Sequence, residues 1–275
     1  MWYRAAAIGS LMTCSAPMPA WAMPCASTAL VLAIDASASI GDAEFAFQMQ
    51  ATALALVDPE VVAAMQAAGG VAVAAVIWGD SAWGAHIIEW QLVSTTEQAK
   101  MFAASLVTQA RRVSGNTDIG RGVEVALDLL DRPDNCASRW IIDVSGDGRE
   151  TLLARTRSIS LLAARERARG LGVTINGLAI TIDDPGLSQY YASRLILGEG
   201  SFVVTVADWA SFREALKHKL LREVGPLPAV AALDDEDTPA DRLLASTRAF
   251  DGPREHLKSG HDLPPVTVTP AALIQ

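Results

Sequence analysis

The stretch Leu30-Val31-Leu32-Ala33-Ile34-Asp35-Ala36-Ser37-Ala38-Ser39 (LVLAIDASAS) decides the fold prediction. Its first five residues are apolar, which is typical of a strand buried inside a sheet. An acid and two hydroxyl residues then stand at every second position. Because alternate side chains of an extended chain point to the same side, Asp35, Ser37 and Ser39 can direct three oxygen atoms at one point. We expect a buried strand that ends in an oxygen-rich loop.

Short apolar runs and longer helical patterns alternate along the rest of the chain. Runs rich in β-branched residues predict strands over 29–34, 71–77, 86–92, 139–144, 173–180 and 202–206. Apolar residues at helical spacing predict helices over 43–57, 96–111, 120–130, 155–169 and 208–224. Strands that alternate with helices form βαβ units. The predicted fold class is α/β, a doubly wound, mainly parallel six-stranded sheet with helices on both faces.

The third expected strand differs from the others in direction. Residues 86–92 follow the second strand after only a short turn over 79–84. That turn is too short for a crossover helix, so we expect this strand to pair antiparallel at an edge of the sheet. Two helix starts are also marked, because Asp42 and Asp208 stand where a carboxylate can cap free backbone N–H groups.

Two more loops carry oxygen-bearing side chains. Residues 114–122 (SGNTDIGRG) open a helix and offer the hydroxyl of Thr117, and residues 141–148 (IIDVSGDG) end a strand and offer the carboxylate of Asp147. Open α/β folds bind ligands at the carboxyl edge of the sheet, where Asp35 also stands. Oxygen donors favour a hard cation, and a small set of them suits Mg²⁺.

These three loops, in this order, resemble the metal-ion-dependent adhesion site of von Willebrand factor type A (vWA) domains, a Rossmann-like fold. The resemblance covers residues 26–224, and the phrases IDVSGDG and GVTINGLAI further resemble an uncharacterised group of secreted bacterial members. It implies that Mg²⁺ or Mn²⁺ is held by Ser37, Ser39 and Thr117, with Asp35 and Asp147 bound directly or through water. It also implies one open position for an acidic side chain of a protein partner.

Several residues around these loops have alternative interpretations. Gly146 departs from the family, which more often has a hydroxyl residue before the Asp-Gly pair. Asp143 and Asp118 either support the metal loops from behind or have local roles; for Asp143 that role is to satisfy backbone donors, and for Asp118 it is solvent exposure. The serines and Thr117 themselves have an alternative role as simple helix caps.

Composition excludes some classes of partner and suggests export. The formal net charge is −9, and no Lys/Arg run could neutralise a phosphate backbone, so we expect no nucleic acid. Residues 1–22 combine one cation, a short apolar run and Ala20-Trp21-Ala22, which indicates a cleaved signal peptide and a periplasmic or secreted protein. No other run reaches the roughly 18 to 20 apolar residues of a membrane span. The Pro-rich, acidic segment 225–275 predicts a disordered tail with one short helix near 241–249.

Removal of a signal peptide leaves two cysteines, Cys25 and Cys136, which permit one bridge. In the sheet order of the vWA family the first and fourth strands are neighbours. The resemblance therefore implies that both thiols start side by side at the amino edge and form a structural disulfide, opposite the metal site. The alternative is two buried free thiols.

The leading functional hypothesis is an exported, non-enzymatic binding module that engages an acidic group of a protein partner through a divalent cation. One alternative is a Mg²⁺-dependent hydrolase or phosphoryl-transfer enzyme that uses the same loops. The chain has no Gly-x-Ser-x-Gly elbow and no Walker loop to support it. A second alternative is a metal-free scaffold.

Overall fold

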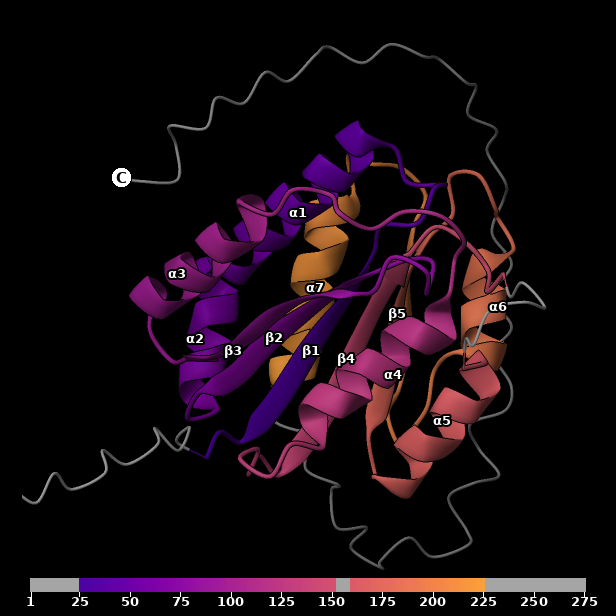
Figure 1. The fold of residues 1–275 in the computed structure, drawn as a ribbon. Coiled ribbons are helices and arrows are strands. Elements are labelled where there is room, and N and C mark those ends of the chain that lie inside the picture. Colours follow the sequence, from indigo (N-terminus) through magenta and orange to yellow (C-terminus); the bar gives the residue numbers. More distant parts are fainter. Residues whose placement is uncertain (1–24, 152–158, 226–275) are drawn as a thin grey trace, which may run out of the picture. The chain divides into compact units, whose positions relative to one another are not determined.

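The computed structural model describes residues 25–151 and 159–225. A central sheet runs through this part of the chain (Figure 1). All six expected strands are present: β1 (Thr28–Asp35), β2 (Val71–Trp78), β3 (His86–Val93), β4 (Arg139–Gly146), β5 (Thr174–Ile180) and β6 (Val203–Val206). The strand order is β3-β2-β1-β4-β5-β6. β3 pairs antiparallel with β2 at one edge and every other pair is parallel, which confirms the predicted fold class.

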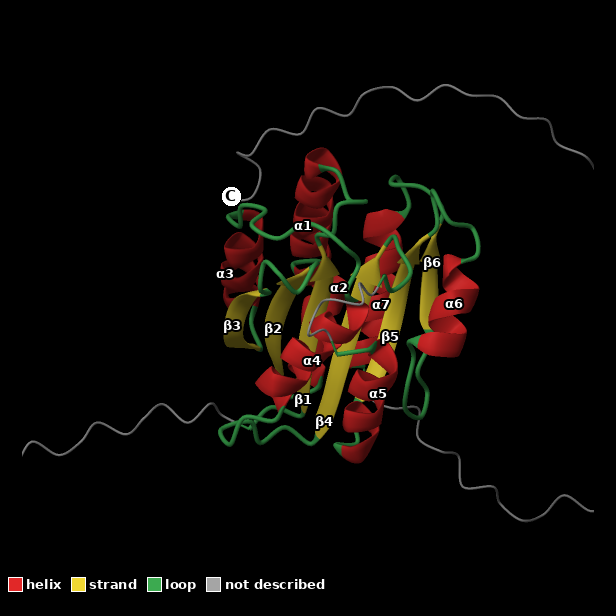
Figure 2. Cartoon of the chain, turned by 45° about the vertical axis from the view of Figure 1, so that its right-hand side comes forward, coloured by secondary structure: helices red, strands yellow, loops and turns green. Residues whose placement is uncertain are grey.

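Helices cover both faces of the sheet. The two groups are α1 (Asp42–Leu56), α2 (Pro59–Ala67), α3 (Thr96–Val107) and α7 (Phe212–Val224) on one face, and α4 (Ile119–Leu130), α5 (Leu161–Gly170) and α6 (Leu187–Arg194) on the other. Figure 2 shows α4 and α5 in front of the strands and α7 behind them. Each face buries its own hydrophobic cluster. Both β1 and β2 are buried along their whole length, as their unbroken apolar sequences predict.

Two helices were not predicted, and several boundaries differ. α2 follows α1 directly: Pro59 begins it, and Asp58 caps it by accepting the N–H of Glu60 at 3.0 Å. α6 lies after β5 with Gly186 as its N-cap and no side-chain cap. α3 ends at Val107 rather than at 111, α5 begins at Leu161, and part of the expected helix over 155–169 lies outside the described residues.

Neither predicted acid caps its helix. α1 begins after Gly41, whose N–H donates to the carboxylate of Glu44 at 2.7 Å, while Asp42 forms an ion pair with Arg111. α7 begins at Phe212, so Asp208 lies before the helix and accepts the N–H of Ser211 at 2.8 Å. Both expected caps are therefore wrong, because the helices start one to four residues away from the expected positions.

One glycine sets how closely α4 approaches the sheet. The indole of Trp78, at the end of β2, is fully buried, and a Cβ on Gly122 of α4 would lie 2.6 Å from its Cγ. No side chain fits between the helix and this ring. The close approach places the N-terminus of α4, and with it the preceding loop, beside the carboxyl ends of the strands.

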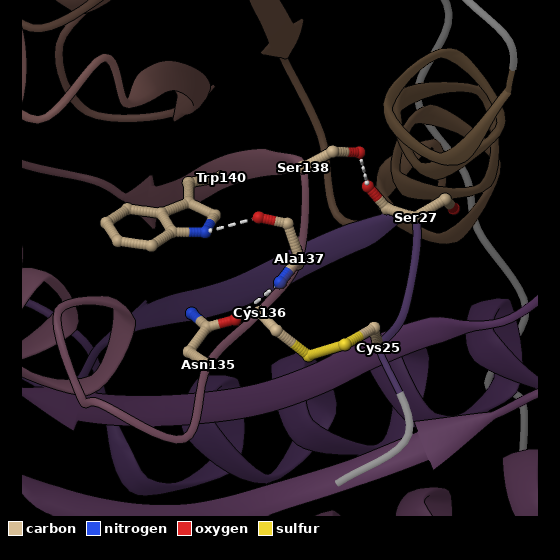
Figure 3. The surroundings of a disulfide bond; sticks show 7 residues. All are labelled: Cys25, Ser27, Asn135, Cys136, Ala137, Ser138 and Trp140. Carbon is tan, nitrogen blue, oxygen red and sulfur yellow. Dashed lines mark hydrogen bonds between the residues drawn. A yellow bond between two sulfur atoms is a disulfide. The ribbon is translucent and has the colours of Figure 1, made fainter.

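The expected disulfide joins Cys25 to Cys136 at the amino edge of the sheet, with a Cα–Cα distance of 5.2 Å. Figure 3 shows the bridge beside the starts of β1 and β4. The hydroxyl of Ser138 donates to the carbonyl of Ser27 at 2.9 Å, which ties the same two segments together (Figure 3). The prediction of this bridge from the vWA strand order is confirmed.

Some predictions concern parts of the chain that the structure does not describe. The expected signal peptide over 1–22 and the tail with its helix near 241–249 lie outside the described residues. Within the described ranges, no helix is long and apolar enough to cross a membrane.

Candidate metal centre

The predicted oxygen donors meet at the carboxyl edge of two neighbouring strands. β1 and β4 are parallel and paired, so Asp35 at the end of β1 lies next to the loop that follows β4. That loop begins with Asp147. Thr117 comes from the loop that leads into α4. Residues far apart in the sequence therefore share one edge, as the topology requires.

Hydrogen bonds link four of the five predicted side chains in a row. The hydroxyl of Thr117 donates to Oγ of Ser37 at 3.3 Å. Oγ of Ser37 and Oγ of Ser39 lie 3.1 Å apart, and the Ser39 hydroxyl donates to Oδ1 of Asp147 at 2.6 Å. The row joins the loops after β1, before α4 and after β4.

Asp35, the fifth predicted donor, lies on the buried side of this row of side chains. Its side chain is fully buried, and Oδ1 accepts the backbone N–H of Ser37 at 2.7 Å. Oδ2 is also buried but has no hydrogen-bond partner in the protein. Burial, and to a smaller extent the charge of Asp147, raises the pKa of Asp35 to about 7. A carboxylate in this position stabilises whatever positive charge is placed beside it.

Asp147 lies near two acidic residues from other segments, Glu44 and Asp183. Burial raises its pKa, the Ser39 hydroxyl lowers it, and the charges of Glu44 and Asp183 raise it further. The negative potential at the site therefore comes from Glu44 and Asp183 as well as from Asp35 and Asp147. The local field favours a cation.

The residues fit a hard divalent cation. The five donors are all oxygens, and an unpartnered buried carboxylate oxygen stands among them. Within residues 25–151 and 159–225, no group of three or more His, Cys, Asp or Glu side chains could hold a metal, so the site depends on its hydroxyls. The capping alternative is not supported, because the N-cap of α1 is Gly41 and that of α4 is Asp118.

A protein-family model described as "Protein of unknown function (DUF1194)" matches residues 24–228. The chain belongs to this family. No curated protein is similar enough to count as a match.

Solved structures show that this DUF1194 member has the fold of a vWA domain. The pilus adhesin SpaC from Lactobacillus rhamnosus GG is similar at a TM-score of 0.54 and 13% identity, over 72% of this chain and 31% of SpaC. A von Willebrand factor type A protein from Catenulispora acidiphila is similar at 0.51 and 18%, over 73% of this chain and 43% of that one. The vWF domain of the type V pili tip protein Mfa5 from Porphyromonas gingivalis is similar at 0.50 and 12%, over 74% and 98%. The chain thus spans less than half of the first two proteins.

Arg111 holds in place the loop between β1 and α1 of this DUF1194 domain, residues 36–41, here called the serine loop. Its guanidinium donates to the carbonyl oxygens of Ala36 at 3.1 Å and Ser37 at 2.7 Å, and to Oδ1 of Asp42 at 2.7 Å. These bonds fix the backbone between Asp35 and α1 from outside. Sequence analysis missed this residue because its partners lie about 70 positions earlier in the chain.

Asp80 performs a similar task for the loop that carries Thr117. Its Oδ2 accepts from the side-chain amide of Asn116 at 2.5 Å and from the Asn116 backbone N–H at 3.3 Å. Gly115 has a φ of +87°, and a Cβ there would lie 2.6 Å from Cβ of Asp80. The loop also accepts a hydrogen bond from Ala38 N to Gly115 O at 2.7 Å, which couples it to the serine loop.

Asp143 does not support the metal loops, and that expectation is wrong. In β4 it pairs in register with Leu32 of β1, three residues before Asp35, so its side chain points to the opposite face of the sheet. There its Oδ1 lies 2.7 Å from Nζ of Lys219 on α7, which also forms an ion pair with Glu223. The amide of Asn176 donates to Glu223 at 2.9 Å. Asp143 therefore belongs to a buried charge network beneath α7.

Asp118 is buried rather than exposed, so the expectation of solvent exposure is also wrong. It is the N-cap of α4, and its Oδ1 accepts the N–H of Arg121 at 3.1 Å. By fixing the start of α4 it fixes the residue before it, Thr117. Glu150 acts on the same region, since its carboxylate accepts the N–H groups of Gly120 at 3.1 Å and Leu161 at 2.7 Å.

Proposed function

We propose that this DUF1194 protein is an exported, non-enzymatic vWA binding module that engages an acidic group of a protein partner through a divalent cation. Asp35, Ser37, Ser39, Thr117 and Asp147 would hold the cation, which is Mg²⁺ or Mn²⁺. The observation that carries this proposal is the row of hydrogen-bonded hydroxyls that ends on Asp147 beside the unpartnered Oδ2 of Asp35. Export is proposed from the signal-like sequence over 1–22.

The electrostatics of the site support strict dependence on the cation. Glu44 and Asp183 add negative charge beside Asp147, so an acidic partner is repelled from the metal-free site. A bound divalent cation supplies positive charge that offsets this repulsion and an open ligand position that the carboxylate can take. The partner's carboxylate and the cation should therefore bind in a mutually dependent way.

Exposed apolar side chains at the same edge suit a protein partner. Trp83, in the turn after β2, is 64% exposed, and Ile182, just after β5, is 40% exposed. In the strand order they stand on either side of the β1 and β4 ends that carry the site. Aromatic and aliphatic anchors around a polar centre are common in protein interfaces.

The non-enzymatic character is proposed because no histidine of the described residues is free to act as a general base at the donors, and the carboxylates of Asp35 and Asp147 would be occupied as cation ligands. The two histidines within the described ranges are engaged elsewhere: Nε2 of His86 bonds to Gln109 at 2.6 Å, and Nε2 of His218 lies 3.1 Å from Glu214. Hydrolysis or phosphoryl transfer at these loops would need such a group.

Affinity capture tests the proposal. The protein is expressed from the full sequence, immobilised on a resin in buffer that contains Mg²⁺, and incubated with periplasmic or culture proteins. EDTA is then added to elute bound proteins. We expect EDTA to release a bound partner, and Asp147→Ala to capture none. Asp134→Ala is the matched control, because Asp134 is an exposed acid before β4 at the opposite edge of the sheet. Capture that survives EDTA, or that Asp147→Ala retains, would contradict the proposed cation bridge. Turnover of phosphoesters lost in Asp35→Ala would favour the enzyme instead.

A further inference from the structure

Tyr191 of α6 is fully buried in a slot that two glycines create. A Cβ on Gly177 of β5 would lie 2.9 Å from Cδ2 of the ring, and a Cβ on Gly146 of β4 would lie 2.8 Å from the phenol oxygen. These two strands are neighbours in the sheet. The absence of side chains at both positions lets the phenol ring cross β5 and reach the carboxyl end of β4.

The phenol oxygen reaches the candidate metal centre beside Asp35. The same Cβ position on Gly146 lies 2.8 Å from Oδ2 of Asp35, so the phenol and the carboxylate oxygen border one small space. The Tyr191 hydroxyl has a bond to the carbonyl of Gly148 at 3.5 Å, the outer limit for such a contact. Oδ2 of Asp35 has no partner. Buried tyrosine hydroxyls and carboxylate oxygens normally have well-formed hydrogen bonds.

We infer that Tyr191 is a positioning residue of the metal centre, whose hydroxyl donates a hydrogen bond to Oδ2 of Asp35 when the cation is bound. This inference rests on the proposed function. A side chain at position 146 cannot fill the role, because its Cβ would collide with both oxygens. Position 146 therefore has no side chain, and Tyr191 of α6, 45 residues later in the sequence, supplies a hydroxyl at the same place.

Loss of the Tyr191 hydroxyl should change the affinity for the cation by a measurable amount. Groups that orient a metal ligand without touching the metal typically change metal affinity by about 10- to 100-fold when removed. Tyr191→Phe deletes only the hydroxyl and keeps the ring packed against the face of β4 and β5. The change should therefore act on cation affinity and leave the fold intact.

Calorimetric titration of the full chain with Mg²⁺ and Mn²⁺ tests the inference, together with thermal melting in EDTA. Tyr190→Phe is the matched control: Tyr190 is the adjacent residue, and its hydroxyl accepts the N–H of Glu150 at 3.3 Å instead. We expect Tyr191→Phe to weaken the Kd of both cations by about 10- to 100-fold. We expect Tyr190→Phe to change it by less than about 2-fold, and both variants to melt like the wild type in EDTA.

A second variant keeps the test independent of the tyrosine. Gly146→Ala places a methyl group 2.8 Å from both oxygens, so it should also reduce cation affinity. An unchanged Kd in Tyr191→Phe, or an equal loss in Tyr190→Phe, would overturn the inference while leaving the proposed metal site standing. A wild type that binds neither cation would overturn the proposed site and this inference with it.

Discussion

The buried carboxylate of Asp35 predicts an unusual pH dependence for the metal-free protein. Its side chain is fully buried, and its pKa rises from 3.8 to about 7, mainly because burial disfavours the charged form. The folded protein therefore holds this proton more tightly than the unfolded chain does. The stabilisation is complete below the unfolded pKa and is lost as the pH rises through about 7. Asp35→Asn keeps the shape and the oxygen that faces Ser37 but removes the titration.

The size of the effect follows from the two pKa values. The interval from 3.8 to about 7 corresponds to about 4 kcal/mol, at about 1.4 kcal/mol for each tenfold change in proton affinity. Integrated over the experimental range, about 3 kcal/mol of this is lost between about pH 5 and pH 8. Asp35→Asn should lose none of it.

Urea unfolding in EDTA at a series of pH values measures this difference. The free energy of unfolding of the wild type should fall by about 3 kcal/mol more than that of Asp35→Asn across the range. Asp134→Asn, an exposed carboxylate at the other edge, serves as control and should track the wild type. Mg²⁺ should restore the wild type at high pH and leave Asp35→Asn unchanged. Parallel curves for wild type and Asp35→Asn would refute the reasoning, because a carboxylate whose pKa rises on burial must make the free energy of unfolding depend on pH.

Three further predictions concern the parts that hold the site. Replacing Cys25 and Cys136 by serine removes a bridge across 111 positions and should lower the free energy of unfolding by about 2–4 kcal/mol, measured by urea denaturation; a reducing agent should then affect only the wild type. Lys219→Met leaves the buried carboxyl groups of Asp143 and Glu223 without their cation and should lower the free energy of unfolding by about 3–5 kcal/mol in urea denaturation. The loss should be smaller at low pH, where both carboxyl groups are neutral, and an unchanged free energy of unfolding would mean that the network is not charged. Arg111→Ala should weaken Mg²⁺ binding by about 10-fold in calorimetry, because the carbonyls of the serine loop lose their clamp, and an unchanged Kd would show that the loop is rigid without it.

Local sequence determined the strands and the candidate donors. The β-branched, aliphatic run over 30–34 predicts a strand buried in the sheet, and the oxygen-bearing residues Asp35, Ser37 and Ser39 stand where that strand ends. The alternation of an extended chain, however, does not continue past Asp35, because the following residues form a turn in which the N–H of Ile40 donates to the carbonyl of Ser37 at 3.1 Å. The short turn over 79–84 likewise forces an antiparallel partner. These properties depend on neighbours within a few positions, so they could be predicted without coordinates.

Tertiary structure decided the roles of residues that look alike in sequence. Asp143 and Asp35 are both acids in or at the end of apolar strands. Strand register turns one toward Lys219 on α7 and the other toward the donors at the sheet edge. The same holds for Tyr191, whose hydroxyl lies near Asp35 because α6 packs on β5 at Gly177 and the ring extends to Gly146 of β4, two register positions further along the sheet. These contacts join positions many residues apart, and the short-range patterns of a sequence carry no record of which distant side chain will share a buried space.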